Sequence, residues 1–197
     1  KIEEAILKTR YKNLYVLPAN LNLAGIDIEI SEKSRVDNTF LKQEQLKNSI
    51  DRIKDSFDYI IIDCPPALGM LTVNALAASD ATLVPVQANY LSAKGLEQLL
   101  ATINQVKRQI NPKLCIEGIL ITMVEARTNY AKDISNLIRD IYCNKINVFE
   151  TEIPRSVRTA ETSAEGKSIF AYDPSGKVAE AYSSLTQEVL SYDQKRN

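Results

Sequence analysis

The sequence predicts an α/β protein with a mostly parallel β-sheet and helices on both faces. Short apolar segments alternate with longer amphipathic ones along the chain, which is typical of successive βαβ units. The run Ile60-Ile61-Ile62 is apolar at every position, as a parallel strand covered by helices on both faces requires. Strands of an antiparallel sandwich would alternate apolar and polar residues, so the pattern favours a parallel sheet.

Five short apolar segments are expected to form the strands, at residues 14–17, 59–63, 81–86, 115–122 and 148–153. Residues 169–172 are a sixth candidate. Helical periodicity lies between them, over residues 38–55, 70–79, 93–110, 130–142, 157–162 and 175–192. In the segment that begins at Ala93, apolar residues recur three or four positions apart, which predicts one face on the sheet and one in solvent. This helix is expected to end near Asn111, because Pro112 disfavours helical backbone in the residue before it.

The composition is that of an ordinary globular protein. Of 197 residues, 45% are hydrophobic and 25% are charged, and the formal net charge is -1, which excludes a mainly disordered chain. Neither a repeat nor a low-complexity linker divides the sequence, so a single domain over residues 1–197 is expected. The longest apolar runs fall well short of the roughly 18 residues that a membrane span requires.

Two residue counts exclude whole classes of chemistry. The chain has no histidine, which rules out Ser-His-Asp and Cys-His nucleophile pairs, histidine-ligated zinc and histidine proton shuttles. The three cysteines, Cys64, Cys115 and Cys143, are far apart and form no C-x-x-C pair. They indicate a reducing, cytoplasmic setting without a disulfide framework.

No glycine-rich phosphate loop can be drawn in the sequence. The six glycines are at least ten residues apart, so neither G-x-G-x-x-G nor G-x-x-x-x-G-K-[ST] is present. Gly166-Lys167-Ser168 has the last three letters of the second motif, but Glu161 stands where its first glycine is required. The match is therefore a false one.

The clearest local signal for chemistry is Asp63 at the end of the apolar run 59–63. Ligands of open α/β sheets bind outside the carboxyl ends of strands. Pro65 and Pro66 follow and stiffen the loop, so Asp63 is held where a Walker B carboxylate binds magnesium or its waters. The structural alternative is an aspartate that only caps the loop.

Residues 58–69, with the sequence DYIIIDCPPALG, resemble the switch II segment of ParA/Soj-type partition ATPases, members of the MinD/ParA superfamily with a P-loop NTPase-like fold. Three further blocks follow in the family's order. Residues 84–96 resemble the strand and loop on the dimer side, and residues 118–129 the strand that reaches the adenine. Residues 153–158, continued by Glu161 and Gly166-Lys167, resemble the late nucleotide and DNA loop. The blocks together span nearly the whole chain.

The resemblance implies an ATPase for plasmid or chromosome partition that uses ATP and magnesium. Members form ATP-dependent homodimers, bind DNA without sequence preference, respond to a ParB-like partner and act in the cytoplasm on the nucleoid. Asp63 resembles the catalytic switch II residue that holds magnesium through water. Met123, Pro154 and Arg155 resemble the nucleotide-binding residues around the adenine. Arg127 and Arg158 resemble the arginines that contact DNA phosphates.

The family also has features that this sequence lacks. Members begin with a deviant Walker A loop, K-G-G-x-G-K-[ST], and a strand ending in D-x-D-P-Q, and both are expected to precede Lys1. Because the P-loop supplies most of the grip on the phosphates, these 197 residues alone are expected to bind ATP poorly and to show no ATPase activity. The first strand would lie inside the sheet, so its absence would leave backbone groups unpaired.

Two other functions remain open at this stage. One is a nucleotide-free binding or regulatory module that keeps the fold and its partner surfaces. The other is a MinD-like membrane ATPase, but such proteins bind through a basic amphipathic C-terminal helix, and the end of this chain is only weakly basic, so no membrane partner is expected. The late loop lacks two prolines that the family usually has, and Glu165 places a negative charge beside the proposed DNA surface.

Overall fold

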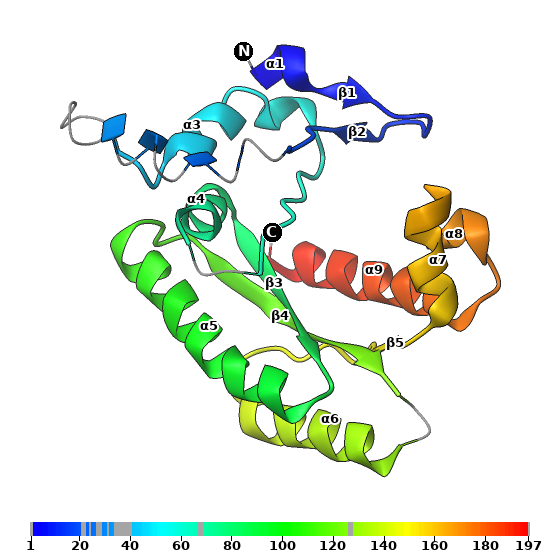
Figure 1. Cartoon of the computed structure of the whole chain (residues 1–197). Helices are drawn as coiled ribbons and strands as arrows, with labels where there is room; N and C mark the ends of the chain where they lie inside the picture. The colour runs from blue at the N-terminus through cyan, green and yellow to red at the C-terminus, as the bar shows by residue number, and fades with distance from the viewer. Residues whose placement is uncertain are drawn as a thin grey trace. The chain divides into compact units, whose positions relative to one another are not determined.

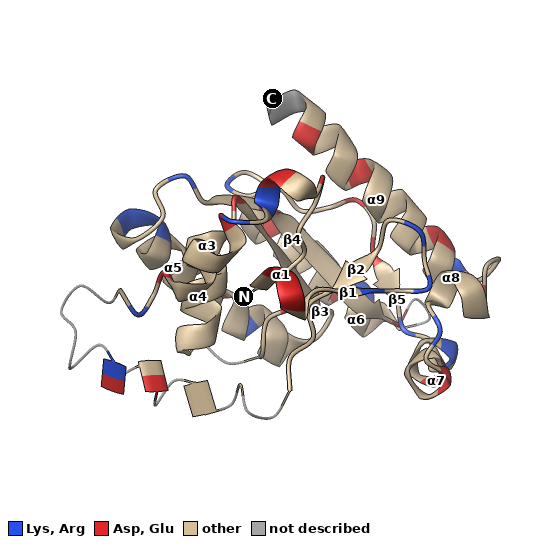
Figure 2. Cartoon of the chain, turned by 90° about the horizontal axis from the view of Figure 1, so that it is seen from above, with Lys and Arg blue, Asp and Glu red and all other residues tan. Residues whose placement is uncertain are grey.

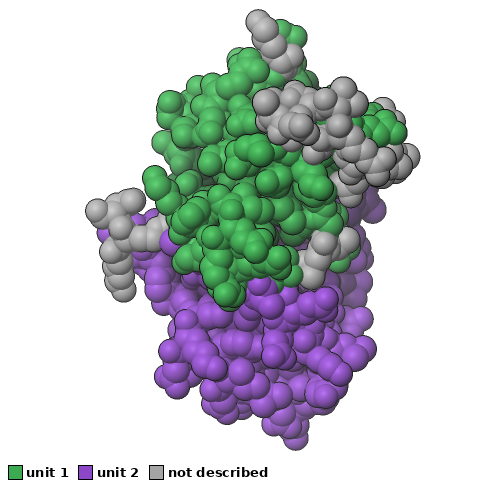
Figure 3. Space-filling view, turned by 90° about the vertical axis from the view of Figure 1, so that its left-hand side faces the viewer, with its two compact units in different colours: residues 1–80, 102–114 green, residues 81–101, 115–197 purple. Residues whose placement is uncertain are grey.

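The computed structural model describes residues 2–20, 41–66, 69–125 and 128–196, together with residues 23, 25, 26, 29, 30, 32 and 33. The chain divides into two compact units (Figure 3). Unit 1 contains residues 1–80 and 102–114, and unit 2 contains residues 81–101 and 115–197.

The parallel sheet lies in unit 2 and has the strand order β3-β4-β5. Strand β3 (Ala81–Gln87) pairs in parallel with β4 (Cys115–Val124), and β4 pairs in parallel with β5 (Ile153–Pro154). The predicted strands at 81–86 and 115–122 are therefore confirmed. The strand expected over 148–153 is shorter, with an isolated bridge between Val148 and Ile119 followed by β5.

Helices connect and cover these strands, as expected for an α/β fold. Helix α5 (Tyr90–Gln109) follows β3, α6 (Asn129–Tyr142) follows β4, and α9 (Lys177–Arg196) packs against β5. Figure 1 shows α6 and α9 on opposite sides of the strands. Thr128 begins α6, and its hydroxyl accepts a hydrogen bond from the Ala131 N–H, which satisfies an otherwise unpaired donor of the first turn.

The core between β4, β5 and α9 depends on one aromatic ring and one glycine. Phe149 is fully buried, in a cluster with Leu120, Ile153, Val178 and Leu185. Gly118 of β4 leaves room for this ring, because a Cβ at that position would lie 2.7 Å from Phe149 Cε2 and 2.8 Å from Asn147 Nδ2. A glycine is therefore required here by close packing.

The two short helices of unit 2 precede α9. Helix α7 (Val157–Glu165) ends at Gly166, whose φ of 57° is the left-handed conformation favoured after a helix. Residues 169–172, a candidate strand from the sequence, form helix α8 (Ile169–Tyr172), so the strand prediction is wrong. The reason is local hydrogen bonding, since the Ser168 hydroxyl and carbonyl accept bonds from the Ala171 and Tyr172 N–H groups and start a helical turn.

The described part of unit 1 contains several short elements, two of which are joined by a buried polar side chain. Its described elements are α1 (Ile2–Ala5), the antiparallel pair β1 (Leu7–Lys8) and β2 (Tyr15–Val16), α3 (Gln45–Ile50), a 3-10 helix (Lys54–Ser56) and α4 (Met70–Ala78). The buried Asn74 side chain accepts from the Leu46 N–H at 3.2 Å and donates to the Lys42 carbonyl at 2.9 Å. This side chain joins α4 to the start of α3.

Three expectations for unit 1 need qualification. The strand over 14–17 exists only as Tyr15–Val16, within an antiparallel hairpin. The helix over 38–55 is interrupted, with α3 and the 3-10 helix separated by turns, and residues 38–40 lie outside the described part. Residues 59–63 form no strand, and Ile61 is 92% exposed. A strand needs a neighbouring strand to pair with, and no described segment forms a ladder with this one.

Candidate functional site

The carboxyl end of β4 has an irregular backbone centred on Met123. The register of β4 on β5 shifts between Thr122, which pairs with Ile153, and Val124, which pairs with Pro154. Met123 is the extra residue, with a φ of 52° and a side chain 56% exposed. A non-glycine residue in this conformation costs on the order of 1–2 kcal/mol, so the paired residues on either side must hold it there. Such bulges often turn a side chain toward a site at the end of a sheet.

Pro154 and Arg155 lie beside this bulge. Pro154 is opposite Val124 in the ladder, and the Arg155 N–H donates to the Val124 carbonyl at 3.1 Å. The structure thus brings together Met123, Pro154 and Arg155, which the resemblance assigns to adenine binding. Their assignment to a nucleotide remains a prediction.

The described basic side chains of the expected DNA loop are each paired with a carboxylate. Arg155 pairs with Glu125, Arg158 Nη1 lies 2.8 Å from Asp173 Oδ1, and Lys167 lies 3.2 Å from Glu165. Figure 2 shows basic and acidic segments close together around α7. Arg127, the other predicted DNA residue, lies outside the described residues.

A second pair accompanies Arg158 and Asp173. The Tyr172 hydroxyl donates to Glu161 Oε2 at 2.9 Å, and this hydrogen bond to a carboxylate raises the pKa of Tyr172. Arg158 and Glu161 are three positions apart on α7, so they lie on one side of the helix. This side of α7 is therefore joined to the end of α8 by two polar contacts.

Asp63, the predicted magnesium residue, belongs to unit 1. Its side chain is exposed, in the segment without regular structure between the 3-10 helix and α4. Among the residues that the structure describes, no three cysteine, aspartate or glutamate side chains gather so as to hold a metal ion. A carboxylate oxygen is a ligand that magnesium prefers. Among the described residues, Asp63 would therefore offer such an oxygen without two further acidic or cysteine side chains beside it.

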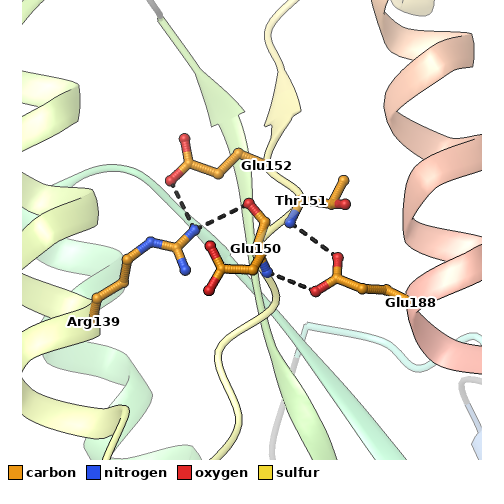
Figure 4. A network of polar contacts seen from close by, with 5 residues as sticks. All are labelled: Arg139, Glu150, Thr151, Glu152 and Glu188. Carbon is orange, nitrogen blue, oxygen red and sulfur yellow. Dashed lines mark hydrogen bonds and ion pairs between the residues drawn. The ribbon is translucent and has the colours of Figure 1, made fainter. Parts of the chain in front are cut away.

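Sequence reasoning missed the contacts that hold the approach to β5. Arg139 of α6 donates through Nη2 to the Glu150 carbonyl at 3.3 Å and to Glu152 Oε1 at 3.2 Å. Glu188 of α9 accepts from the N–H groups of Glu150 at 2.7 Å and Thr151 at 3.0 Å. Figure 4 shows Arg139 and Glu188 on opposite sides of this segment.

These contacts fix the three residues immediately before Ile153 and Pro154. The Glu188 carboxylate can satisfy two backbone donors because it has two acceptor oxygens. The partners lie 11 to 38 residues apart in sequence, so no local motif marks them. Only the fold brings them together.

The loop after β3 is tied to the start of α6. The Tyr90 N–H donates to the Tyr130 hydroxyl at 3.1 Å. Tyr90 and Tyr130 are 59% and 56% exposed, and the adjacent Leu91 is 78% exposed. These apolar side chains belong to the block expected on the dimer side and to the beginning of α6.

Comparison with known proteins defines the family. A family model described as an AAA domain matches residues 1–116. The chain is 42% identical to the sporulation initiation inhibitor protein Soj of Bacillus subtilis over 95% of this chain and 71% of Soj. It is 39% identical to the chromosome partitioning protein ParA of Myxococcus xanthus over 98% of this chain and 65% of that protein. The chain belongs to the ParA/Soj family of chromosome partitioning ATPases.

Solved structures show the same fold. A cobyrinic acid a,c-diamide synthase from Mycobacterium smegmatis, with bound ADP and magnesium, is 33% identical, with a TM-score of 0.70 over 79% of this chain and 59% of that one. The cell division ATPase MinD of Pyrococcus furiosus, 21% identical, shares the fold with a TM-score of 0.72 over 96% of this chain and 70% of MinD. The predicted MinD/ParA superfamily fold is confirmed. Across the described helices, none has the length and apolar character of a membrane span.

Proposed function

We propose that this protein is a partition ATPase that acts in the segregation of a chromosome or plasmid. It binds ATP and magnesium, forms an ATP-dependent homodimer on DNA of any sequence, and is stimulated by a ParB-like partner. It works in the cytoplasm on the nucleoid, and residues 1–197 form the C-terminal part of a single ATPase domain. The grouping of Met123, Pro154 and Arg155 at the carboxyl edge of β4 and β5 carries the proposal.

The residues at this edge suit a nucleotide base. The Met123 side chain is exposed and polarizable, and Pro154 is half-buried and apolar, both of which suit contact with an aromatic base. Carboxyl edges of parallel strands are the usual ligand sites of open α/β sheets. Arg155 lies next to them, paired with Glu125. In the proposed complex these side chains hold the base and restrict its orientation.

Magnesium binding is assigned to Asp63. Its exposed carboxylate follows the apolar residues 59–62 and precedes Pro65 and Pro66, which restrict the loop. The carboxylate would hold the metal, and magnesium would supply positive charge that offsets the charge of the phosphates. The bound ADP and magnesium of the cobyrinic acid a,c-diamide synthase support this choice of cofactors.

DNA binding is assigned to Arg158 and Arg127. A protein with a net charge of -1 can bind a polyanion only through a local basic surface. The Arg158 side chain is 64% exposed, so it can reach a phosphate. Contacts to phosphates carry no sequence information, which agrees with binding to any DNA.

Substitution of Asp63 tests the proposed function. In the intact protein, Asp63→Ala should lower magnesium-dependent ATP hydrolysis by about a hundredfold or more, a typical loss for one group that stabilises transition-state charge. Asp58→Ala, at the opposite end of the same apolar run, is the matched control and should keep its activity. The measurement is phosphate release with and without magnesium.

Other outcomes would favour the other candidate functions. Hydrolysis that is unchanged by Asp63→Ala would contradict the magnesium assignment. An intact protein that neither binds nor hydrolyses ATP would favour a nucleotide-free binding module. Binding to anionic lipid vesicles in place of DNA would favour a MinD-like membrane ATPase.

A further inference from the structure

Arg158 and Asp173 form an asymmetric ion pair. The contact joins Arg158 Nη1 to Asp173 Oδ1 at 2.8 Å. The arginine side chain is 64% exposed, whereas the aspartate side chain is only 18% exposed. A guanidinium has five N–H donors in a fixed plane, so one such contact leaves donors for a second anion. The arginine is thus the accessible member of the pair, and the aspartate supports it from the protein side.

The backbone around Asp173 fixes the position of its carboxylate. The Asp173 N–H donates to the Ile169 carbonyl at 2.8 Å, and the Asp173 carbonyl accepts from the Gly176 N–H at 3.0 Å. Pro174 follows and restricts the turn. The carboxylate lies against Gly176, where an added Cβ would overlap it, at 2.5 Å from Cγ. Gly176 therefore makes room for the carboxylate directly before α9, where the helix dipole favours a negative charge.

The main chain beneath Arg158 is fixed as well. The hydrogen bond between Tyr172 and Glu161 joins α8 to α7 on the same side as the ion pair. Both ends of the pair thus have restricted backbones, and the ion pair holds the arginine side chain between them. A long side chain that is already held in one orientation loses less conformational freedom when it binds.

We propose that Asp173 is a positioning residue for DNA binding: it holds Arg158 with its remaining N–H groups directed to a DNA phosphate. The inference rests on the proposed DNA-binding function. It makes an unusual prediction about charge, because loss of a carboxylate near a DNA surface ordinarily strengthens binding. Here the loss of this one should weaken binding, since Arg158 would no longer be held.

The test compares two variants that remove one negative charge each. With ATP, magnesium and duplex DNA of mixed sequence, Asp173→Asn in the intact protein should weaken binding about threefold to tenfold, as for a lost orienting contact to a charged group. Glu165→Gln is the matched control. Glu165 pairs with Lys167 in the adjacent loop at 3.2 Å, and its removal should leave binding equal or tighter. Tighter binding by both variants would show an effect of charge alone and overturn the inference.

Gly176→Ala displaces the carboxylate without removing its charge. The added methyl group would force the Asp173 side chain away from its present position. The Gly176→Ala variant should bind the same DNA more weakly, as Asp173→Asn does. Its thermal melting temperature should stay close to that of the unchanged protein. Unchanged binding in a folded Gly176→Ala variant would overturn the inference.

A double-mutant cycle separates positioning from a general structural role. In an Arg158→Ala background, Asp173→Asn should have no further effect on DNA affinity, because the residue it orients is gone. A loss that persists in this background would indicate a structural role and overturn the inference. If Arg158→Ala alone leaves binding unchanged, the DNA-binding assignment of Arg158 fails together with the inference. If Arg158→Ala weakens binding and Asp173→Asn does not, only the inference fails.

Discussion

Strand β4 in unit 2 and the segment 59–63 in unit 1 have the same sequence pattern and different structures. Both are apolar runs rich in isoleucine, and both were expected to be buried parallel strands. In β4, Ile119 and Ile121 are fully buried, and the strand pairs on both sides. In the segment 59–63, Ile61 is 92% exposed and no ladder forms.

The difference shows what an apolar run encodes. An apolar run indicates that a segment is suited to burial on both faces. A strand forms only if neighbouring segments supply hydrogen-bond partners for its backbone N–H and C=O groups. Strand β4 has β3 and β5. The described residues offer no such neighbours to the segment 59–63.

Truncation of one isoleucine in each region should give the largest difference. In the 197-residue chain, Ile121→Ala should lower the free energy of unfolding by about 2–5 kcal/mol, since it leaves a cavity in a packed core. Ile61→Ala should change it by less than about 0.5 kcal/mol, because the side chain is exposed. Urea unfolding followed by circular dichroism measures both. Equal losses would contradict the description of the segment 59–63.

Substitution of Gly118 tests the packing of β4 on its buried side. Gly118→Ala should destabilise the chain by about 1–3 kcal/mol, because the methyl group would overlap Phe149. Gly95→Ala on α5 is the matched control. No atom lies within 4 Å of a Cβ at that position, and alanine should stabilise the helix by about 0.5–1 kcal/mol. Thermal melting of the two variants should therefore shift in opposite directions, and a shift in the same direction would refute the packing argument.

Glu188→Gln tests the contacts that hold the residues immediately before β5. An amide retains one acceptor oxygen, so one of the Glu150 and Thr151 N–H groups would lose its partner. The free energy of unfolding should fall by about 1 kcal/mol, a typical value for one hydrogen bond. Glu97→Gln, exposed in the middle of α5, serves as the control and should change the free energy of unfolding by less than about 0.5 kcal/mol. If the two variants have equal stability, Glu188 does not hold this segment.

Met123→Gly should have the smallest effect on stability and a separate effect on binding. Glycine adopts the positive φ of this position without strain, so the chain should gain about 0.5–1 kcal/mol. Asn13→Gly, at the other described non-glycine residue with a positive φ, should change less, because asparagine tolerates this conformation. Nucleotide affinity of the intact protein should fall in Met123→Gly only. A destabilised Met123→Gly variant would indicate that the side chain packs in a way that its exposure does not suggest.

Much of the fold could be predicted from the sequence. This was so where the hydrophobic periodicity of a segment predicts the same element that its packing neighbours favour. The strands at 81–86 and 115–122 and the helices that begin near Met70, Ala93, Tyr130 and Ser175 follow from periodicity. Residues 169–172 were considered as a strand and form a helix, because the Ser168 cap outweighs the apolar composition of four residues. In short apolar segments, periodicity alone does not distinguish a strand from a helix.

The candidate site was predictable only in part. The resemblance identified Met123, Pro154 and Arg155, and the structure brings them together at one edge. The positive φ of Met123 had no local signal, because it depends on the register of β4 with a segment 30 residues later. The partners Asp173 and Glu188 were missed for the same reason, since contacts between distant residues have no fixed spacing in sequence.

Hydrogen exchange of the intact protein, with and without ATP and magnesium, tests the central claim most directly. The claim is that the carboxyl ends of β4 and β5 bind the nucleotide. Peptides that cover residues 122–125 and 153–155 should become protected when ATP binds. A peptide from the second half of α9 should show no change in exchange. ATP binding without protection of these two segments would contradict the account.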